Sequence, residues 1–120
     1  MPHVVEMRIY RVKPGKREEL LHLFRTRAMP EHAAIGMKIL GPFPAVDDPD
    51  AFFFMRAFPD VESREPMKTR FYGSELWLRE LEPVMMPMID KYEAVLVEDT
   101  LGLFDWDCAR ITSVTTGTTR

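Results

Sequence analysis

The chain has 120 residues and a formal net charge of −3, with 46% hydrophobic and 29% charged residues. This length and balance predict one globular domain with a substantial core, and they exclude a disordered polar chain. The acidic balance gives no support to nucleic-acid binding, which needs a clustered basic surface. The single cysteine, Cys108, excludes an internal disulfide and a cysteine-based metal site, and we expect it to be inert.

Targeting and metal-binding signals are weak. Residues 1–6 lack a basic segment followed by an apolar one, and the chain has no apolar stretch of about 20 residues, so we expect a cytoplasmic protein without a membrane span. The histidines are scattered without i, i+4 pairing, which argues against a metal site. We also expect no cofactor.

The first half of the chain predicts a strand followed by a helix. Residues 4–13 alternate between a wholly apolar face and a mixed face, as a strand does. Pro14-Gly15 ends this strand, and residues 16–28 have helical spacing. Pro30 is expected to kink or end that helix, with a further turn over 31–35 that Gly36 closes as a left-handed cap.

A β-hairpin is expected in the middle of the chain. Its arms are residues 37–46 and 52–58, joined by a turn over 47–50. Pro42 and Pro44 place the first arm at a sheet edge or at a bulge. Asp60 predicts the N-cap of a second helical region, which Pro83 and Pro87 are expected to end, and residues 92–99 predict the last strand.

The element order is β-α-β-β-α-β, which predicts an α+β, ferredoxin-like fold in residues 1–100. Such a fold has a four-stranded antiparallel sheet with both helices on one face, and residues 101–120 are expected to pack on the domain or on a dimer partner. We expect the mixed strand face to be the bare one, and its exposed apolar area then predicts a homodimer through that face. The side chains assigned to it are Arg8, Tyr10, Phe54, Arg56 and Phe58.

Several short motifs resemble the NIPSNAP family. Residues 6–16 (EMRIYRVKPGK) are similar to its opening acidic-x-Arg-x-Tyr strand and Lys-Pro-Gly turn. The similarity continues through Gly36, the strand 53–58, Asp60, residues 63–65 and the segment from Phe71-Tyr72 to Trp77, so that it covers residues 4–98.

The resemblance implies a dimeric α+β barrel, which is also called a dimeric α/β barrel. This is the superfamily fold of cofactor-independent antibiotic-biosynthesis monooxygenases, stress-responsive barrel proteins and haem-handling barrels. The activity of the family is generally unassigned, and its animal members are discussed as adaptors in membrane and mitochondrial contexts.

Candidate binding residues lie on the mixed face. Arg8 and Tyr10 project the same way, Glu6 precedes them, and Arg56 can approach Glu6 if the two strands are neighbours. One interpretation is a pocket between sheet and helices, in which Arg8 or Arg56 holds a carboxylate or enolate and Tyr10 donates a hydrogen bond. The other is a buried Glu–Arg pair that fixes the dimer without any chemistry.

His32 is a second candidate. It would suit a general base at neutral pH, or it is a capping or exposed residue at a helix end. Phe71, Tyr72 and Trp77 are predicted to wall a pocket for a flat apolar ligand, although core packing explains Phe71 and Trp77 equally well.

Three functions therefore remain open. The first is a small barrel that binds an apolar, aromatic or anionic ligand between sheet and helices, with Arg8, Tyr10, Phe54, Arg56, Phe71, Tyr72 and Trp77 in the site. The second is a cofactor-independent monooxygenase or isomerase acting on a small aromatic or polyketide-like substrate, with His32, Tyr10 and Arg8 as catalytic candidates. The third is an interaction adaptor that uses residues 101–120.

Overall fold

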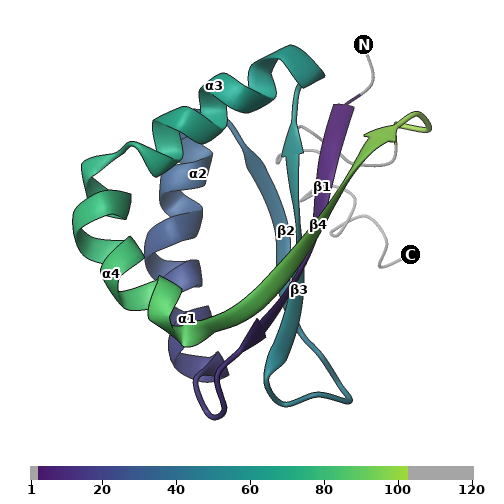
Figure 1. Cartoon of the computed structure of the whole chain (residues 1–120). Helices are drawn as coiled ribbons and strands as arrows, with labels where there is room; N and C mark the ends of the chain where they lie inside the picture. The colour runs from purple at the N-terminus through teal and green to yellow at the C-terminus, as the bar shows by residue number, and fades with distance from the viewer. Residues whose placement is uncertain (1–2, 103–120) are drawn as a thin grey trace, which may run out of the picture.

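The protein was analysed as a computed structural model, which describes residues 3–102. Its sheet consists of β1 (His3–Val12), β2 (Lys38–Pro44), β3 (Ala51–Phe58) and β4 (Ile89–Asp99). All neighbouring strands are antiparallel, in the order β2-β3-β1-β4. The helices lie together on one side of this curved sheet (Figure 1). The predicted ferredoxin-like α+β fold is confirmed.

Two helical stretches form the second layer. The first comprises α1 (Arg17–Leu23), the π-helical turn η1 (Phe24–Ala28) and α2 (Met29–Ile35). After the hairpin come α3 (Val61–Tyr72), a second π-helical turn η2 (Leu76–Leu81), α4 (Glu82–Met85) and the 3₁₀ turn η3 (Met86–Met88). Buried leucine, phenylalanine and methionine side chains from both stretches pack on Phe52, Phe54 and Phe58 of the sheet.

Prolines do not break these helical stretches, which corrects the expectation for Pro30 and Pro83. Each follows a π-helical turn whose next backbone N–H reaches five residues back: Met29 to the carbonyl of Phe24, and Glu82 to that of Trp77. A proline ring normally collides with the carbonyl four residues earlier. The wider π turn relieves that contact, so the chain stays helical through the proline.

The covered face of the sheet is the mixed one, so the predicted bare face was wrong. Cα partners across β1 and β3 include Glu6 with Arg56 and Arg8 with Phe54. These four side chains are 6% exposed or less because they point into the helical layer. Phe58, also assigned to the bare face, is fully buried.

The uncovered face carries the wholly apolar side of β1 instead. Met7 pairs with Met55 of β3 and with Val95 of β4, so these side chains are direct neighbours on that face. Five large apolar side chains there are more than a third exposed: Met7, Ile9, Leu40, Phe43 and Val95. The helix-free face therefore presents a nearly continuous apolar surface.

The hairpin has the predicted features. β2 is an edge strand, and its register with β3 shifts between Leu40 and Phe43, around Gly41-Pro42. The loop is tied back to the rest of the fold by Arg17, whose Nη1 donates to the backbone carbonyls of Ala45, Asp48 and Ala51 at 2.9–3.2 Å. This clamp fixes the loop near the start of the first helical stretch.

Two helix ends are as predicted. Gly36 closes α2 with φ 106°, a left-handed value, and its N–H bonds the carbonyls of His32 and Ala33. The Asp60 side chain caps α3 by accepting from the Ser63 backbone N–H at 2.8 Å. The predicted C-terminal segment 101–120 and Cys108 fall, except for residues 101–102, outside the residues that the structure describes.

Replacement of Gly36 is a direct test of the left-handed cap. A Cβ at φ 106° is strained, so we expect Gly36→Ala to lower the free energy of unfolding by about 1–2 kcal/mol in urea denaturation. Gly36→Asn is the matched control, because asparagine tolerates this conformation better, and its loss should be smaller. Equal stability of the alanine variant and the wild type would contradict this assignment.

Candidate functional site

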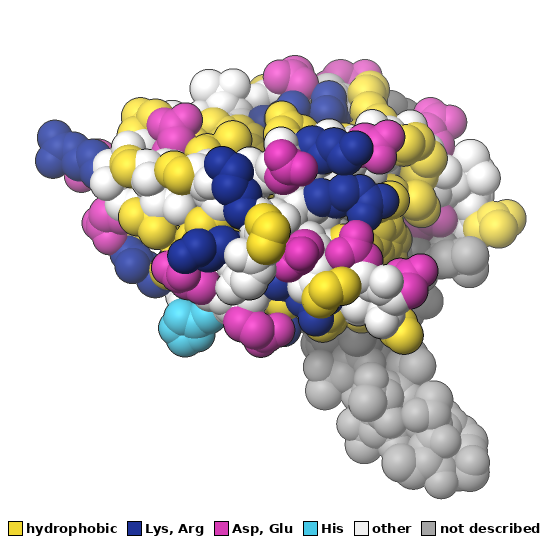
Figure 2. Space-filling model, turned by 60° about the horizontal axis from the view of Figure 1, so that its bottom comes forward, with side chains coloured by type: hydrophobic (Ala, Val, Ile, Leu, Met, Phe, Trp, Pro, Cys, Tyr) yellow, Lys and Arg dark blue, Asp and Glu magenta, His cyan; other side chains and the backbone are white. Residues whose placement is uncertain are grey.

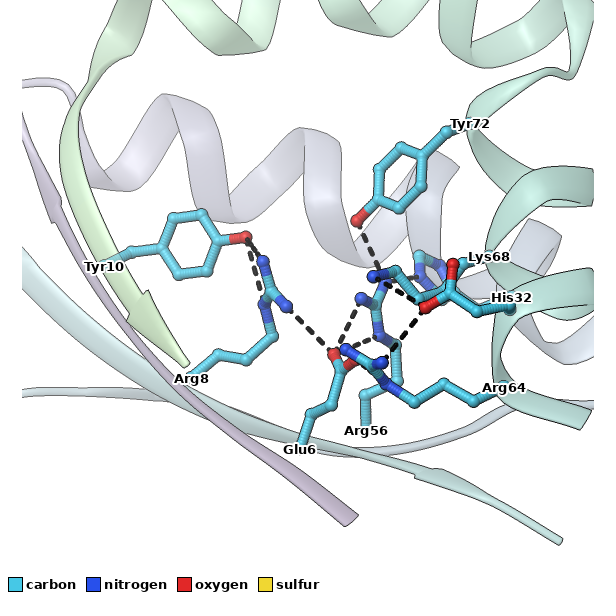
Figure 3. A network of polar contacts seen from close by, with 9 residues as sticks. Glu6, Arg8, Tyr10, His32, Arg56, Arg64, Lys68 and Tyr72 are labelled. Atoms are coloured by element: carbon cyan, nitrogen blue, oxygen red, sulfur yellow. Dashed lines mark hydrogen bonds and ion pairs between the residues drawn. The ribbon is translucent and has the colours of Figure 1, made fainter. Parts of the chain in front are cut away.

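A buried polar network lies between the sheet and the helices. Glu6 and Arg8 come from β1, Arg56 from β3, His32 from α2, and Tyr72 from α3 (Figure 3). Strand alternation and the Glu6–Arg56 register bring the first three onto one face, and the helices that cover this face bring the other two. All but Tyr72, which is half-buried, are almost fully buried.

Glu6 is the centre of this network. Its Oε1 accepts from Arg8 Nη1 at 2.9 Å, Arg56 Nε at 3.0 Å and Arg56 Nη2 at 2.7 Å, and its Oε2 accepts from Arg64 Nε at 2.7 Å. Burial alone would raise the pKa of Glu6, but the charges and hydrogen bonds of these arginines lower it to about 2. Glu6 is therefore a carboxylate at neutral pH.

Arg56 extends the network toward the helices. Its Nη1 lies 3.0 Å from His32 Nε2 and donates to the Tyr72 hydroxyl oxygen at 3.0 Å. His32 Nδ1 lies 2.8 Å from the backbone carbonyl of Ala28. Since a guanidinium only donates, Nε2 is the acceptor and Nδ1 carries the proton. Burial and the nearby Arg56 charge lower the pKa of His32 to about 4, so the ring is neutral.

Arg8 occupies the other side of Glu6. Its Nε and Nη2 donate to the Tyr10 hydroxyl oxygen at 3.2 and 3.0 Å. Its guanidinium carbon also lies 5.1 Å from the centre of the Tyr92 ring, a cation–π distance. Tyr92 and Tyr10 are Cα partners across β4 and β1, and their rings stack with centroids 5.1 Å apart.

These groups line one cavity of about 590 Å³. Its polar end is formed by Arg8, Arg56, Arg64 and Lys68 around Glu6. Its other walls are aromatic and aliphatic, and they are formed by Tyr10, Leu20, Phe24, Phe52, Phe54, Phe71, Tyr72, Trp77, Met85, Met86, Ile89 and Tyr92. The site thus joins a buried positive region to a flat apolar one.

The cavity opens along the β4 edge of the sheet. Tyr92 and Ala94 point into it, opposite Tyr10 and Arg8, yet both are exposed. Leu78 and Met86 on the helical side are likewise cavity-lining and exposed, at 50% and 40%. The entrance therefore has an apolar rim, with the charged groups further inside.

The sequence-predicted residues converge on this cavity. Arg8, Tyr10, His32, Phe54, Arg56, Phe71, Tyr72 and Trp77 all line it. Phe71 also packs against His32 and Trp77, with centroids 4.0 and 5.5 Å away, so core packing and wall formation coincide. Whether these residues bind a ligand stays a prediction.

Several lining residues escaped the sequence reasoning. Arg64 and Lys68 are four residues apart on α3 and so share a helix face. This spacing could have predicted them as basic partners for a buried Glu6. The place of Tyr92 in the cavity lining follows from its position opposite Tyr10 in the register of β4 and β1. Ala94 carries no chemical signal, and its importance comes from the space that it leaves beside Arg8.

Other kinds of site find no support in residues 3–102. That part of the chain has no group of histidine, cysteine or acidic side chains able to hold a metal ion. It also has no helix long and apolar enough to cross a membrane. On the face shown in Figure 2, basic and acidic side chains are interspersed. The cytoplasmic location and the lack of nucleic-acid binding stay predictions.

The fold and cavity define a ferredoxin-like α+β protein with a ligand-sized internal space. The NIPSNAP family model matches residues 5–98, and the chain belongs to this family. No curated protein matches it.

Solved structures of bacterial proteins share this fold. A NIPSNAP domain protein from Burkholderia xenovorans is 21% identical, with TM-score 0.73, over 85% of this chain and 99% of its own. A NIPSNAP family protein from Agrobacterium tumefaciens is 24% identical, with TM-score 0.74, over 88% and 90%. A protein from Nitrosomonas europaea, provisionally described as an antibiotic biosynthesis monooxygenase, is 14% identical, with TM-score 0.62, over 82% and 90%.

Removing the central carboxylate tests the network. Glu6→Gln leaves buried guanidiniums without their counter-charge, so we expect a loss of about 3 kcal/mol or more in the free energy of unfolding at pH 7. The control is Glu65→Gln, whose exposed carboxylate pairs with Arg64 and should contribute less than about 1 kcal/mol.

The same variants give a pH signature. The pKa of Glu6 falls from 4.5 to about 2 on folding, so its stabilisation is complete above pH 4.5 and is lost as the pH falls toward 2. Urea denaturation across this range should show that slope in wild type and Glu65→Gln but a weaker one in Glu6→Gln. Parallel curves for all three would contradict the assignment.

Proposed function

We propose that the protein binds a small organic molecule with a flat apolar body and a negative charge, in the cavity between sheet and helices. The observation that supports this proposal most strongly is the excess of positive charge at the polar end of the cavity. Arg8 and Arg56 are both buried and share one buried carboxylate, Glu6, and the partly buried Arg64 and Lys68 add positive charge at the same end of the cavity. An unbalanced buried charge is costly, and an anionic ligand would neutralise it.

The apolar part of the cavity supports a flat ligand. Tyr10 stacks on Phe52 and Tyr92 at centroid distances of 5.2 and 5.1 Å with small interplanar angles, so these rings form a continuous wall. Aromatic faces of this kind favour offset stacking with another ring. A cavity of about 590 Å³ is within the usual size range of ligand sites.

Binding is better supported than catalysis. A monooxygenase or isomerase mechanism on an aromatic or polyketide-like substrate needs a group that can take a proton from it. Glu6, beside the cavity, is held by three arginines, and both ring nitrogens of the lining residue His32 have partners. Glu82 lines the cavity but is exposed. The likeness to the Nitrosomonas europaea protein concerns the fold alone.

The binding proposal is tested with 2-naphthoate as the probe. We expect it to raise the melting temperature of the wild type and to bind in calorimetric titration. Ala94→Phe fills the space beside Arg8 at an exposed strand position, so it should weaken binding at least tenfold without unfolding the protein. Val84→Phe, at an exposed position of α4 that lines neither the cavity nor the helix-free face, is the control and should bind as the wild type does.

Native mass spectrometry of freshly purified protein shows whether the protein already carries a ligand that would compete with the probe. A copurified small molecule that dissociates on denaturation would support the proposal even if 2-naphthoate competes poorly. If no molecule copurifies and the probe does not bind, or binds the Ala94→Phe variant equally, the proposal is wrong.

We also propose that a second copy of the chain covers the helix-free face, as a homodimer. The exposed apolar side chains of this face lie on three of the four strands and are joined by the partly exposed Phe53 and Met55 of β3. A monomer rarely leaves so continuous an apolar surface in water. The adaptor alternative depends on residues 101–120, which lie mostly outside the described part of the chain.

The dimer proposal predicts that Ile9→Glu gives a monomer, since it buries an unpaired charge in the interface. Light scattering after size exclusion measures the mass. Val61→Glu is the control, because Val61 is 54% exposed at the start of α3, away from this face, and it should stay dimeric. A monomeric wild type, or a dimeric Ile9→Glu variant, would overturn the proposal.

A further inference from the structure

The hydroxyl groups of Tyr10 and Tyr72 are oriented by arginines. The Tyr10 oxygen accepts two bonds from Arg8, and the Tyr72 oxygen accepts one from Arg56. A guanidinium has no acceptor atom, so each phenol keeps its own proton to donate elsewhere. Within residues 3–102, neither proton has an acceptor among the hydrogen bonds formed. Both side chains line the cavity and point into the same space (Figure 3).

The two phenols belong to one connected network, because Tyr10 is bonded to Arg8, Tyr72 is bonded to Arg56, and both arginines are bonded to Glu6 Oε1. Burial alone would lower the pKa of Arg8, but its interactions with Tyr10 and Tyr72 raise it. Burial also raises the pKa of Tyr10, which keeps its hydroxyl protonated at neutral pH. The two hydroxyls and the Arg8 guanidinium thus form a group of donors around one part of the cavity.

Arg8 and Arg56 differ in the number of N–H groups that they leave free for a ligand. A guanidinium has five N–H groups. Arg8 uses three of them, one on Glu6 and two on Tyr10. Arg56 makes four contacts, two with Glu6 and one each with His32 and Tyr72. Arg8 is therefore able to bind a ligand, whereas Arg56 orients Tyr72 and holds Glu6.

We infer that Tyr10, Tyr72 and Arg8 form an oxyanion clamp for a planar, singly charged group, a carboxylate or an enolate, on the proposed ligand. These three groups supply donors and no free acceptor, which favours an oxyanion over a neutral amide or alcohol, because hydrogen bonds to a charged acceptor are stronger. Arg64 and Lys68 at this end are partly exposed and pair with the exposed Glu65, so the almost fully buried groups, Arg8, Arg56 and Glu6, leave an excess of one positive charge. This excess favours a monoanion over a phosphate dianion.

The stacked wall of Tyr10, Phe52 and Tyr92 places the flat body of the ligand next to this clamp, toward the apolar entrance. The ligand class is thus an aromatic or conjugated carboxylate, or the enolate of a 1,3-dicarbonyl compound. This inference rests on the proposed function, because it assigns the charged end of the same cavity.

Three probes with one ring system test the clamp: 2-naphthoate, 2-naphthamide and 2-naphthyl phosphate. Calorimetric titration of the wild type should show 2-naphthoate binding at least about tenfold more tightly than the other two. Hydrogen bonds to a charged acceptor contribute about 1.5–3 kcal/mol, so Tyr10→Phe and Tyr72→Phe should each weaken 2-naphthoate binding about tenfold or more. Both substitutions keep the ring, and 2-naphthamide binding should change less than about threefold.

Val84→Phe is again the matched control, with all three affinities unchanged. If both phenylalanine variants bind 2-naphthoate normally while Ala94→Phe blocks it, the clamp is wrong and the cavity-binding proposal survives. If 2-naphthamide binds the wild type as tightly as 2-naphthoate, both the clamp and the negative charge of the proposed ligand are wrong. Tighter binding of 2-naphthyl phosphate would overturn the monoanion class. If no probe binds the wild type and no molecule copurifies, the proposed function and the clamp both fail.

Discussion

The structure depends on one buried carboxylate. Glu6 accepts hydrogen bonds from guanidiniums of β1, β3 and α3, so it ties the two central strands to the helix above them. Burying charges costs solvation energy, so this cluster adds less net stability than its contact distances suggest. Its effect is on position, because each arginine that Glu6 holds then orients another side chain: Arg8 orients Tyr10, and Arg56 orients His32 and Tyr72.

The same cluster explains which face of the sheet is covered. Charged side chains on a strand usually indicate the solvent side, yet the mixed face is the covered one. Here Arg8 and Arg56 share the Glu6 carboxylate, which offsets part of their charge, so the mixed face can be buried. The apolar side chains of Met7, Ile9 and Val95 are left on the outside instead.

Much of the fold could be predicted because local signals agreed with it. The alternation of β1, the bulge in the proline-containing strand, and the Gly36 and Asp60 helix ends all depend on a few neighbouring residues. Period-two alternation, however, separates two faces without saying which one the helices cover. The continuity of the helices through Pro30 and Pro83 also escaped prediction, because it depends on π turns that leave no clear pattern in the sequence.

The candidate site, like the fold, could be predicted from the sequence only in part. Residues with evident chemistry, such as Arg8, Tyr10 and Arg56, were found from spacing alone and do share one cavity. Their roles became distinct only when the hydrogen bonds were counted, since sequence cannot show that Arg56 uses four of its N–H groups and Arg8 only three. His32 likewise changes from a possible base to a neutral acceptor that supports Arg56.

The central claim is that the Glu6-centred network directs free donors at a ligand oxyanion. A crystal structure of the protein with 2-naphthoate tests this claim most directly. The account predicts the carboxylate within hydrogen-bonding distance of the Tyr10 and Tyr72 hydroxyls and of Arg8, with the naphthalene ring against Tyr10 and Tyr92. A carboxylate bound elsewhere, or a ring bound in the cavity with its carboxylate turned toward solvent, would contradict it.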